Sequence, residues 1–184
     1  FGGSQGARFL NEHVPAVLSG LKTAHPQMNL QVTHQTGLHD VESTQSRYDD
    51  TSLASSVTVL PYIEDMPAAY GAADVAICRA GALTVAELTA VGLPCILVPF
   101  PFAADNHQEA NAKVLVDAGA ARLMTQADWQ SEAAITWLAE LATDRGRLQA
   151  MSDAARSAAQ PEAASAVVDD LEAMLETTMT RGAQ

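Results

Sequence analysis

Short apolar runs alternate with longer amphipathic stretches along most of the chain. The apolar runs that resemble buried strands lie at residues 30–34, 57–60, 75–78, 95–98 and 121–124. Strands that alternate with helices are typical of βα units, in which successive strands pair in parallel. The pattern therefore predicts an α/β fold in which helices cover both faces of a parallel sheet.

Helical periodicity is clearest near the N-terminus, where apolar side chains recur on one helical face. That face carries Leu10, Val14, Val17, Leu18 and Leu21. A short helix is expected after Asp65, because Pro67 suits a first helical turn. Two further helices are expected at residues 84–91 and 105–118, since a glycine follows each range.

Two further stretches contain no apolar run that resembles a buried strand. Residues 40–56 are polar, and we expect a surface helix followed by a loop there. From Asp128 onward the chain is rich in alanine and is expected to form three helices, with breaks near Gly146 and at Pro161.

Composition limits the classes of function. The chain has 184 residues, of which 48% are hydrophobic, so it is expected to be one globular domain. Its formal net charge of −12 argues against binding to nucleic acid or to anionic lipid. No apolar run approaches the roughly 18 residues of a membrane span. Cys78 and Cys95 each fall in an apolar run, where we expect them to be small core residues. No cysteine or histidine cluster indicates a metal site, and no cofactor is expected.

A glycine-rich turn opens the chain and leads directly into the first predicted helix. Glycines allow a close backbone approach, and a helix start offers free N–H groups and a positive dipole end, which together suit a diphosphate. The alternative is a tight strand-to-helix turn without a ligand. No strand precedes this turn in the sequence, so we expect further residues upstream of Phe1. The candidate ligand-binding residues are Gly3, Ser4, Gln5 and Gly6.

A second candidate loop follows the predicted strand 75–78 and opens a helix. This is the carboxyl end of a parallel strand, where open α/β sheets bind ligands. Backbone N–H groups here suit a phosphate oxygen, and the Glu87 carboxylate suits two ribose hydroxyls. The alternative is that Thr84 and Glu87 form a capping box. The candidate residues are Arg79, Gly81, Ala82, Leu83, Thr84 and Glu87.

Two more segments follow strands in the same way. At residues 100–111, His107, Gln108 and Asn111 cluster at a helix start and suit sugar hydroxyls, although Asp105 and Gln108 also fit a capping box. At residues 61–66, an apolar strand end offers backbone N–H and C=O groups to the edge of a base, with Ile63 packing on its face, although locally the segment is only a strand-to-helix turn. Independent capping boxes do not require several such loops at one sheet edge, whereas a diphosphate sugar does.

These segments resemble the C-terminal domain of the MurG family of glycosyltransferases. The matching stretches are GGSQGAR at 2–8, PYIEDM at 61–66, AYGAADVAICRAGALTVAEL at 69–88, VGLPCILVPFPFAADNHQEANA at 91–112 and AGAA at 118–121. The resemblance implies a Rossmann-like domain that is one half of a GT-B architecture. Residues 1–184 would then be the C-terminal, UDP-sugar-binding domain, with the N-terminal acceptor domain absent from this chain.

The resemblance also implies an activity and partners. Members of the family are inverting transferases that move N-acetylglucosamine (GlcNAc) from UDP-GlcNAc to the lipid-linked muramoyl-pentapeptide, converting lipid I to lipid II in peptidoglycan synthesis. It implies that Ser4 and its neighbours touch the diphosphate, that the Ile63 backbone reads uracil, and that Glu87 binds ribose. Gln108 and His107 would bind GlcNAc. The full-length enzyme would be cytoplasmic and peripheral on the inner face of the membrane, with lipid and acceptor contacts made by the missing domain.

Other interpretations remain open at this point. The chain would alone bind donor without transferring it, because no residue stands out as the general base. It would otherwise be the donor-binding subunit of a two-chain UDP-GlcNAc transferase. A different class of function is a non-catalytic nucleotide-binding module or a sugar-nucleotide epimerase, for which Glu87 and His107 are the available acid and base pair.

Overall fold

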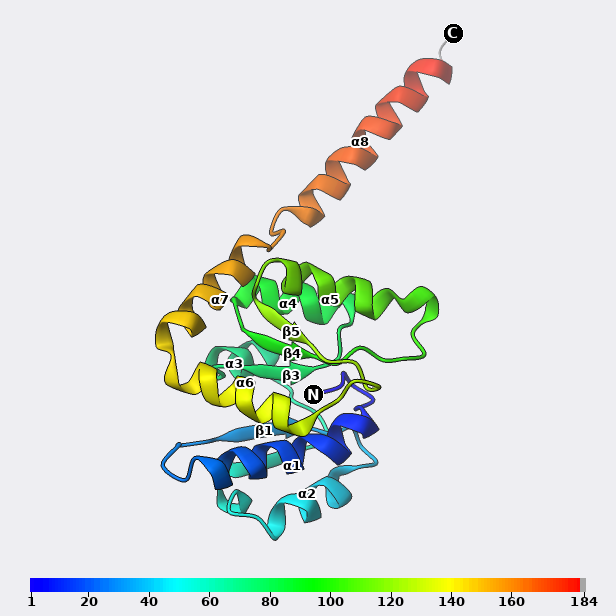
Figure 1. Ribbon diagram of the computed structural model, residues 1–184. Coiled ribbons are helices and arrows are strands. Elements are labelled where there is room, and N and C mark those ends of the chain that lie inside the picture. The colour runs from blue at the N-terminus through cyan, green and yellow to red at the C-terminus, as the bar shows by residue number, and fades with distance from the viewer. Residues whose placement is uncertain (183–184) are drawn as a thin grey trace.

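The computed structural model describes residues 1–182 and confirms the predicted α/β alternation (Figure 1). The strands are β1 (Val32–Gln35), β2 (Val57–Leu60), β3 (Ala76–Cys78), β4 (Cys95–Leu97) and β5 (Ala121–Leu123). The helices are α1 (Arg8–Ala24), α2 (Val41–Asp49), α3 (Met66–Ala72), α4 (Ala82–Val91), α5 (His107–Asp117), α6 (Ser131–Thr143), α7 (Arg145–Ser157) and α8 (Ala163–Gly182), with short 3₁₀ turns at Ala54–Ser56 and Ala104–Asn106.

All strand pairs are parallel, but they form two hydrogen-bonded sheets, where the sequence pattern predicted one. β1 pairs with β2, and β3, β4 and β5 form the second sheet. Phe1 lies beside β3, where its amino group donates to the Ile77 carbonyl at 2.8 Å. The Arg79 N–H in turn donates to the Phe1 carbonyl at 3.3 Å.

Helices cover both sheets, and the sheet of β3, β4 and β5 separates two apolar cores. α1 lies against the β1–β2 sheet and runs beside α6, whose Trp137 and Leu141 join the same core as Leu10 and Val17 (Figure 1). The second core lies around β3 and β4 and takes side chains from α4 and α5, with α7 packed against α4. The apolar face predicted for α1 is buried, as its periodicity required.

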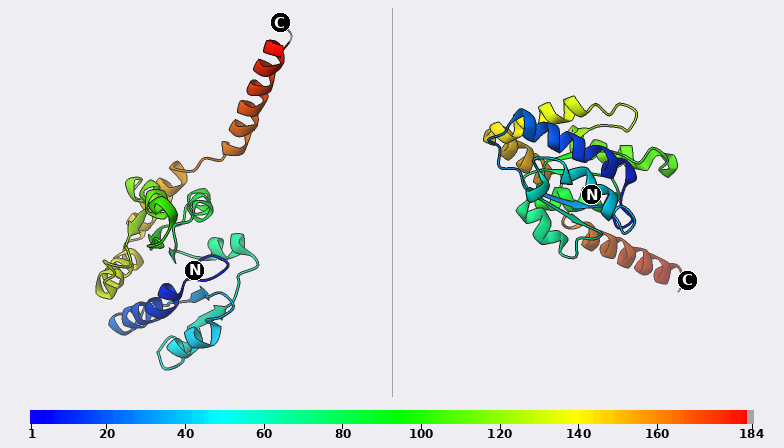
Figure 2. Two further views of the ribbon diagram at one scale, coloured as in Figure 1. Left: turned by 90° about the vertical axis from the view of Figure 1, so that its right-hand side faces the viewer. Right: turned by 90° about the horizontal axis from the view of Figure 1, so that it is seen from below.

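The C-terminal helices follow the predicted count but not every predicted break. The break between α6 and α7 falls at Asp144, whose side chain caps α7 by accepting a hydrogen bond from the Arg147 N–H at 2.8 Å. Gly146 therefore lies inside α7. α8 follows Pro161 and projects away from the rest of the chain (Figure 2).

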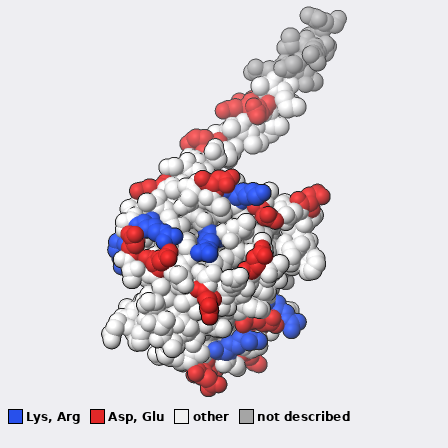
Figure 3. All heavy atoms as spheres, in the orientation of Figure 1, with Lys and Arg blue, Asp and Glu red and all other residues white. Residues whose placement is uncertain are grey.

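Two surface properties bear on the function classes. On the face seen in Figure 3, acidic and basic side chains are interspersed, with no continuous basic patch. Among the described residues, no helix combines the length and the apolar character that crossing a membrane requires.

The cysteines are both buried and unbonded, as predicted, and burial raises the pKa of the Cys78 thiol to about 12.

A buried polar network ties α1, β1 and α2 together. His34, at the end of β1, has one ring nitrogen 3.0 Å from the Tyr48 hydroxyl and the other 3.1 Å from the Asn11 side-chain oxygen. Asn11 also donates to the Thr36 carbonyl at 2.9 Å. Burial lowers the pKa of His34 to about 3, so the ring is neutral at physiological pH. His34 is therefore a structural residue, and α2 is more than a surface helix, because it buries Tyr48 completely.

This network makes stability depend on pH. In the unfolded chain His34 takes up a proton near its ordinary pKa of 6.5, whereas in the folded chain it resists protonation down to about 3. The unfolded state binds more protons between these values, so stability falls as the pH drops through that window. At pH 5 the cost is about 2 kcal/mol.

We expect His34→Gln to reduce this dependence. Urea unfolding of the variant should show a free-energy loss between pH 7 and pH 5 that is about 2 kcal/mol smaller than that of the parent chain. The comparison of the two pH values within each protein removes the variant's constant cost from altered hydrogen bonds. An identical loss in both proteins would contradict the assignment.

Candidate functional site

The glycine-rich turn at residues 2–7 is built for close backbone packing. Gly6 has φ +74°, and a Cβ there would lie 1.8 Å from the Thr36 carbonyl oxygen. Gly37, with φ +81°, would likewise place a Cβ 2.4 Å from the Gln5 carbonyl oxygen. Only glycine fits this contact between the two segments at either position. The turn therefore rests on the backbone that follows β1, which fixes its place at the sheet edge.

The start of α1 has no cap from the chain itself. Its N-cap residue is Ala7, no side chain accepts from its first N–H groups, and its first turn holds no acidic residue. Ser4 and Gln5 are exposed on the turn before it. A helix start with unfilled N–H donors and a positive dipole end is a site for an anion.

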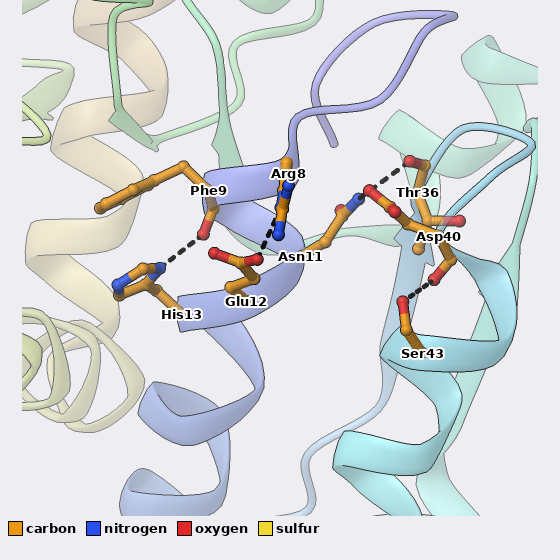
Figure 4. Close-up of polar contacts among 8 residues, drawn as sticks. All are labelled: Arg8, Phe9, Asn11, Glu12, His13, Thr36, Asp40 and Ser43. Carbon is orange, nitrogen blue, oxygen red and sulfur yellow. Dashed lines mark hydrogen bonds and ion pairs between the residues drawn. The ribbon is translucent and has the colours of Figure 1, made fainter.

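Polar side chains of α1 bond to one another and to the segment after β1. Asn11 projects from α1 toward Thr36 and Asp40, donating to the Asp40 carboxylate at 2.8 Å (Figure 4). Arg8 and Glu12 form an ion pair at 2.8 Å on the neighbouring face of the helix. These contacts border a cavity of about 210 Å³ between α1 and α2, in which two basic and two acidic side chains balance. Its lining residues are Arg8, Asn11, Glu12, Asp40, Ser43, Thr44 and Arg47.

The loop after β3 leads into α4, whose N-terminus also lacks a side-chain cap. Gly81 is the N-cap residue, and no side chain accepts from the first N–H groups of the helix. Thr84 lies at the third helical position, so the alternative in which Thr84 and Glu87 form a capping box is wrong. Ala82 and Leu83 are exposed at this start, Leu83 by 74%. The helix start is thus open to a ligand.

Arg79 supplies a buried positive charge beside this loop. Its Nη1 donates to the carbonyls of Val98 and Pro99 at 3.0 and 2.9 Å, and its guanidinium lies 5.5 Å from the centre of the Phe100 ring. Burial lowers the pKa of Arg79 from its ordinary value. The side chain is only 9% exposed, and it lines the cleft described below.

The polar residues at the start of α5 mainly hold loops together. The Gln108 side-chain oxygen accepts from the Phe100 N–H at 2.9 Å and from the Ala80 N–H at 3.3 Å. Asn111 donates to the Ala80 carbonyl at 3.1 Å. The capping box predicted for Asp105 and Gln108 is absent, because Asn106 is the N-cap residue and Asp105 has a left-handed φ of 49°.

His107 makes different contacts from Gln108 and Asn111. One of its ring nitrogens is 2.7 Å from the Ala104 carbonyl, and the residue is exposed. It does not line the cleft.

Gln35 connects the turn to the segment after β2. Its side-chain nitrogen donates to the Gly3 carbonyl at 2.8 Å, and its oxygen accepts from the Ile63 N–H at 2.7 Å. Ile63 is nearly buried, and its N–H is thus already used inside the chain. The Ile63 N–H is therefore not available to a ligand.

Glu87 has a partner that the sequence did not indicate. The Tyr70 hydroxyl, from α3, donates to its carboxylate at 2.8 Å. Burial and this carboxylate together raise the pKa of the Tyr70 hydroxyl, so Tyr70 stays a donor.

The loops meet around one cleft of about 660 Å³. Of the predicted residues, those that line it are Gly3, Gly6, Arg79, Gly81, Thr84 and Gln108. Ser4, Gln5, Ala82 and Leu83 lie on the same loops outside the lining, and Ile63, Glu87, His107 and Asn111 also fall outside it. The turn before α1 and the loops after β3, β4 and β5 thus line one cleft, whereas the segment after β2 does not.

Several lining residues were not identified from the sequence. Phe102 is 84% exposed and packs edge-on against Phe100 at 5.6 Å, which gives the cleft an aromatic wall. Gln126 lines the cleft from the loop after β5, and Phe9 from α1. No sequence motif surrounds Gln126. Its position shortly after a predicted parallel strand was the one feature of the sequence that could have identified it.

Comparison with known proteins gives the same picture. The model of the glycosyltransferase family 28 C-terminal domain matches residues 1–167. UDP-N-acetylglucosamine–N-acetylmuramyl-(pentapeptide) pyrophosphoryl-undecaprenol N-acetylglucosamine transferase of Halorhodospira halophila is 49% identical over 162 residues, which are 88% of this chain and 44% of that protein. The enzyme of the same name from Methylococcus capsulatus is 49% identical over 166 residues, 90% of this chain and 45% of that protein. The chain thus spans less than half the length of these relatives.

Solved structures agree with the sequence matches. Acinetobacter baumannii MurG superposes with a TM-score of 0.81 at 42% identity, covering 93% of this chain and 50% of that one. Spinosyn forosaminyltransferase, at 20% identity and a TM-score of 0.59 over 92% of this chain and 40% of that one, shows the fold alone. The resemblance to the MurG family and the Rossmann-like, GT-B fold class are confirmed. The chain belongs to the glycosyltransferase family 28 C-terminal domain family.

Proposed function

We propose that the chain is the UDP-GlcNAc-binding half of an inverting hexosyltransferase that adds GlcNAc to a lipid-linked muramoyl-pentapeptide in peptidoglycan synthesis. The observation that carries this proposal is the meeting of two helix starts, of α1 and α4, at one cleft without side-chain caps. Such paired anion sites suit a diphosphate. The names of the relatives supply the sugar and the acceptor.

We propose a role for each of these segments in binding the donor. The backbone of the turn at Gly3, Ser4, Gln5 and Gly6 faces the diphosphate, and Arg79 adds positive charge. The α4 start at Gly81, Ala82, Leu83 and Thr84 binds phosphate and ribose oxygens.

The nucleoside lies on the other side of the α4 N-terminus from the diphosphate. The Ile63 carbonyl accepts from the uracil, and Glu87 accepts from the ribose hydroxyls. Gln108 faces the hexose through its side-chain nitrogen, while Asn111 positions the loop at Ala80 and His107 borders the sugar from outside the lining.

The reaction proposed is a direct displacement at the anomeric carbon. The departing UDP carries the negative charge that develops, and the positive ends of α1 and α4, with Arg79, stabilise it. Glu12 is the carboxylate in the lining, but its hydrogen bond to Arg8 lowers its pKa and makes it a poor base. We therefore place the general base and the acceptor site in a second domain, which also contacts the membrane on its cytoplasmic side.

Epimerisation of the same nucleotide sugar is disfavoured by the position of His107. An epimerase needs an acid and a base on either side of one sugar carbon. His107 is exposed, bonded to Ala104, and outside the cleft lining, and Glu87 is bonded to Tyr70. Incubation with UDP-GlcNAc should therefore yield no UDP-N-acetylmannosamine.

We expect UDP and UDP-GlcNAc to bind the chain saturably in calorimetric titrations, and ADP-glucose to bind far more weakly. The uracil edge and the Ile63 backbone form the basis of that selectivity. Absence of a saturable signal from both uridine nucleotides at millimolar concentrations would contradict the proposal.

The role of Glu87 can be separated from its structural contact. In Glu87→Gln the amide oxygen still accepts from the Tyr70 hydroxyl, but the charge that strengthens hydrogen bonds to ribose is lost. We expect UDP binding to weaken by more than ~1 kcal/mol while the melting temperature changes little. The matched control is Tyr70→Phe, which removes the internal bond and keeps the carboxylate, and should weaken binding less. Unchanged UDP affinity in Glu87→Gln would show that the carboxylate is structural.

A further inference from the structure

Gln126 has a side-chain amide that makes no hydrogen bond with any described residue. Its oxygen is buried and unpaired, yet the residue lines the same cleft as Gly3, Arg79 and Gln108. Burial of a polar atom without a partner is unfavourable, and proteins keep few such atoms without a reason. A bound ligand that donates to this oxygen would be such a reason.

The loop that carries Gln126 is held in place by its own contacts. The Met124 N–H extends the β5 ladder by donating to the Leu97 carbonyl at 2.9 Å. The Thr125 hydroxyl donates to the Asp128 carboxylate at 2.8 Å and accepts from the Asp128 N–H at 3.1 Å. The Trp129 ring packs edge-on against Phe9 of α1 at 5.6 Å. Gln126 is thus presented by a fixed loop at the carboxyl end of a parallel strand, where such sheets bind ligands.

The neighbours of Gln126 indicate which part of a donor it meets. The cleft is lined by the glycine-rich turn, Arg79 and the α4 start, whereas Ile63 and Glu87 do not line it. Trp129 brings the loop against the first turn of α1, next to the diphosphate end. A side-chain amide both donates and accepts, which matches sugar hydroxyls, an acetamido group and phosphate oxygens.

We propose that Gln126 is a further donor-binding residue, whose amide hydrogen-bonds the hexose diphosphate end of the nucleotide sugar. This inference rests on the proposed function, since it assigns an additional contact within the same cleft. It also explains why the chain keeps an unpaired amide at this position.

Gln126→Leu tests the proposal, because leucine keeps the volume and removes the amide. Calorimetry should show UDP-GlcNAc binding weakened about fivefold, the effect of one lost neutral hydrogen bond. Binding of UMP, which lacks the second phosphate and the hexose, should be unchanged. The melting temperature of the free variant should stay level or rise, because an unsatisfied polar group has been removed. Gln130→Leu is the matched control: Gln130 is exposed just beyond the same loop and does not line the cleft, so both affinities should be unaffected.

The stability measurement distinguishes a structural role. The indole nitrogen of Trp129 is also buried without a partner in the same loop. If Gln126 instead served that indole, Gln126→Leu would lower the melting temperature and leave UDP-GlcNAc binding unchanged, which would overturn the proposal. Equal weakening of UMP and UDP-GlcNAc would also overturn it. If the parent chain binds no uridine nucleotide, both the proposed function and the role of Gln126 are refuted. If the parent chain and Gln126→Leu bind UDP-GlcNAc equally well, the role of Gln126 alone is refuted.

Discussion

The contact between the turn at residues 2–7 and the backbone after β1 sets the geometry of the cleft. Gly6 and Gly37 allow two main chains to touch where any side chain would collide with a carbonyl group. This contact places the start of α1 at the sheet edge, and the Gln35 amide then fixes the same turn to Ile63. A peptide backbone held this closely presents its N–H groups without competition from side chains, which is the condition for binding an anion at a helix start.

The second half of the cleft is fixed by different chemistry. Gln108 and Asn111, on α5, bind the backbone of Ala80 and Phe100 and so hold the loop that opens α4. Side chains that look like sugar ligands in the sequence therefore spend part of their hydrogen-bonding capacity on the protein. A preorganised loop loses less entropy when it binds, so this internal use supports donor recognition indirectly.

The cleft leaves other groups unsatisfied, which is what a binding site requires. The starts of α1 and α4 have no side-chain cap, and the Gln126 oxygen has no partner among the described residues. Each of these costs stability in the free chain and is compensated when a ligand supplies the missing partner. In the network of His34, Asn11 and Tyr48 the buried polar groups are satisfied, whereas the Thr44 hydroxyl and the Trp129 indole nitrogen are also buried without a partner.

The sequence by itself determined the order of strands and helices, the ends of most elements, and most of the loops that form the cleft. These features follow from side-chain period and from turn residues, whose effects reach only a few positions along the chain. The motif resemblance added the family. The sequence did not determine which hydrogen-bond partners the polar residues choose. Gln35 is hydrogen-bonded to Gly3, 32 positions away in the sequence. Gln35 is also bonded to Ile63, and Gln108 to Ala80, each 28 positions away. The unpaired amide of Gln126 was likewise decided by tertiary packing, because only the folded chain brings distant groups within bonding distance or leaves one of them without a partner.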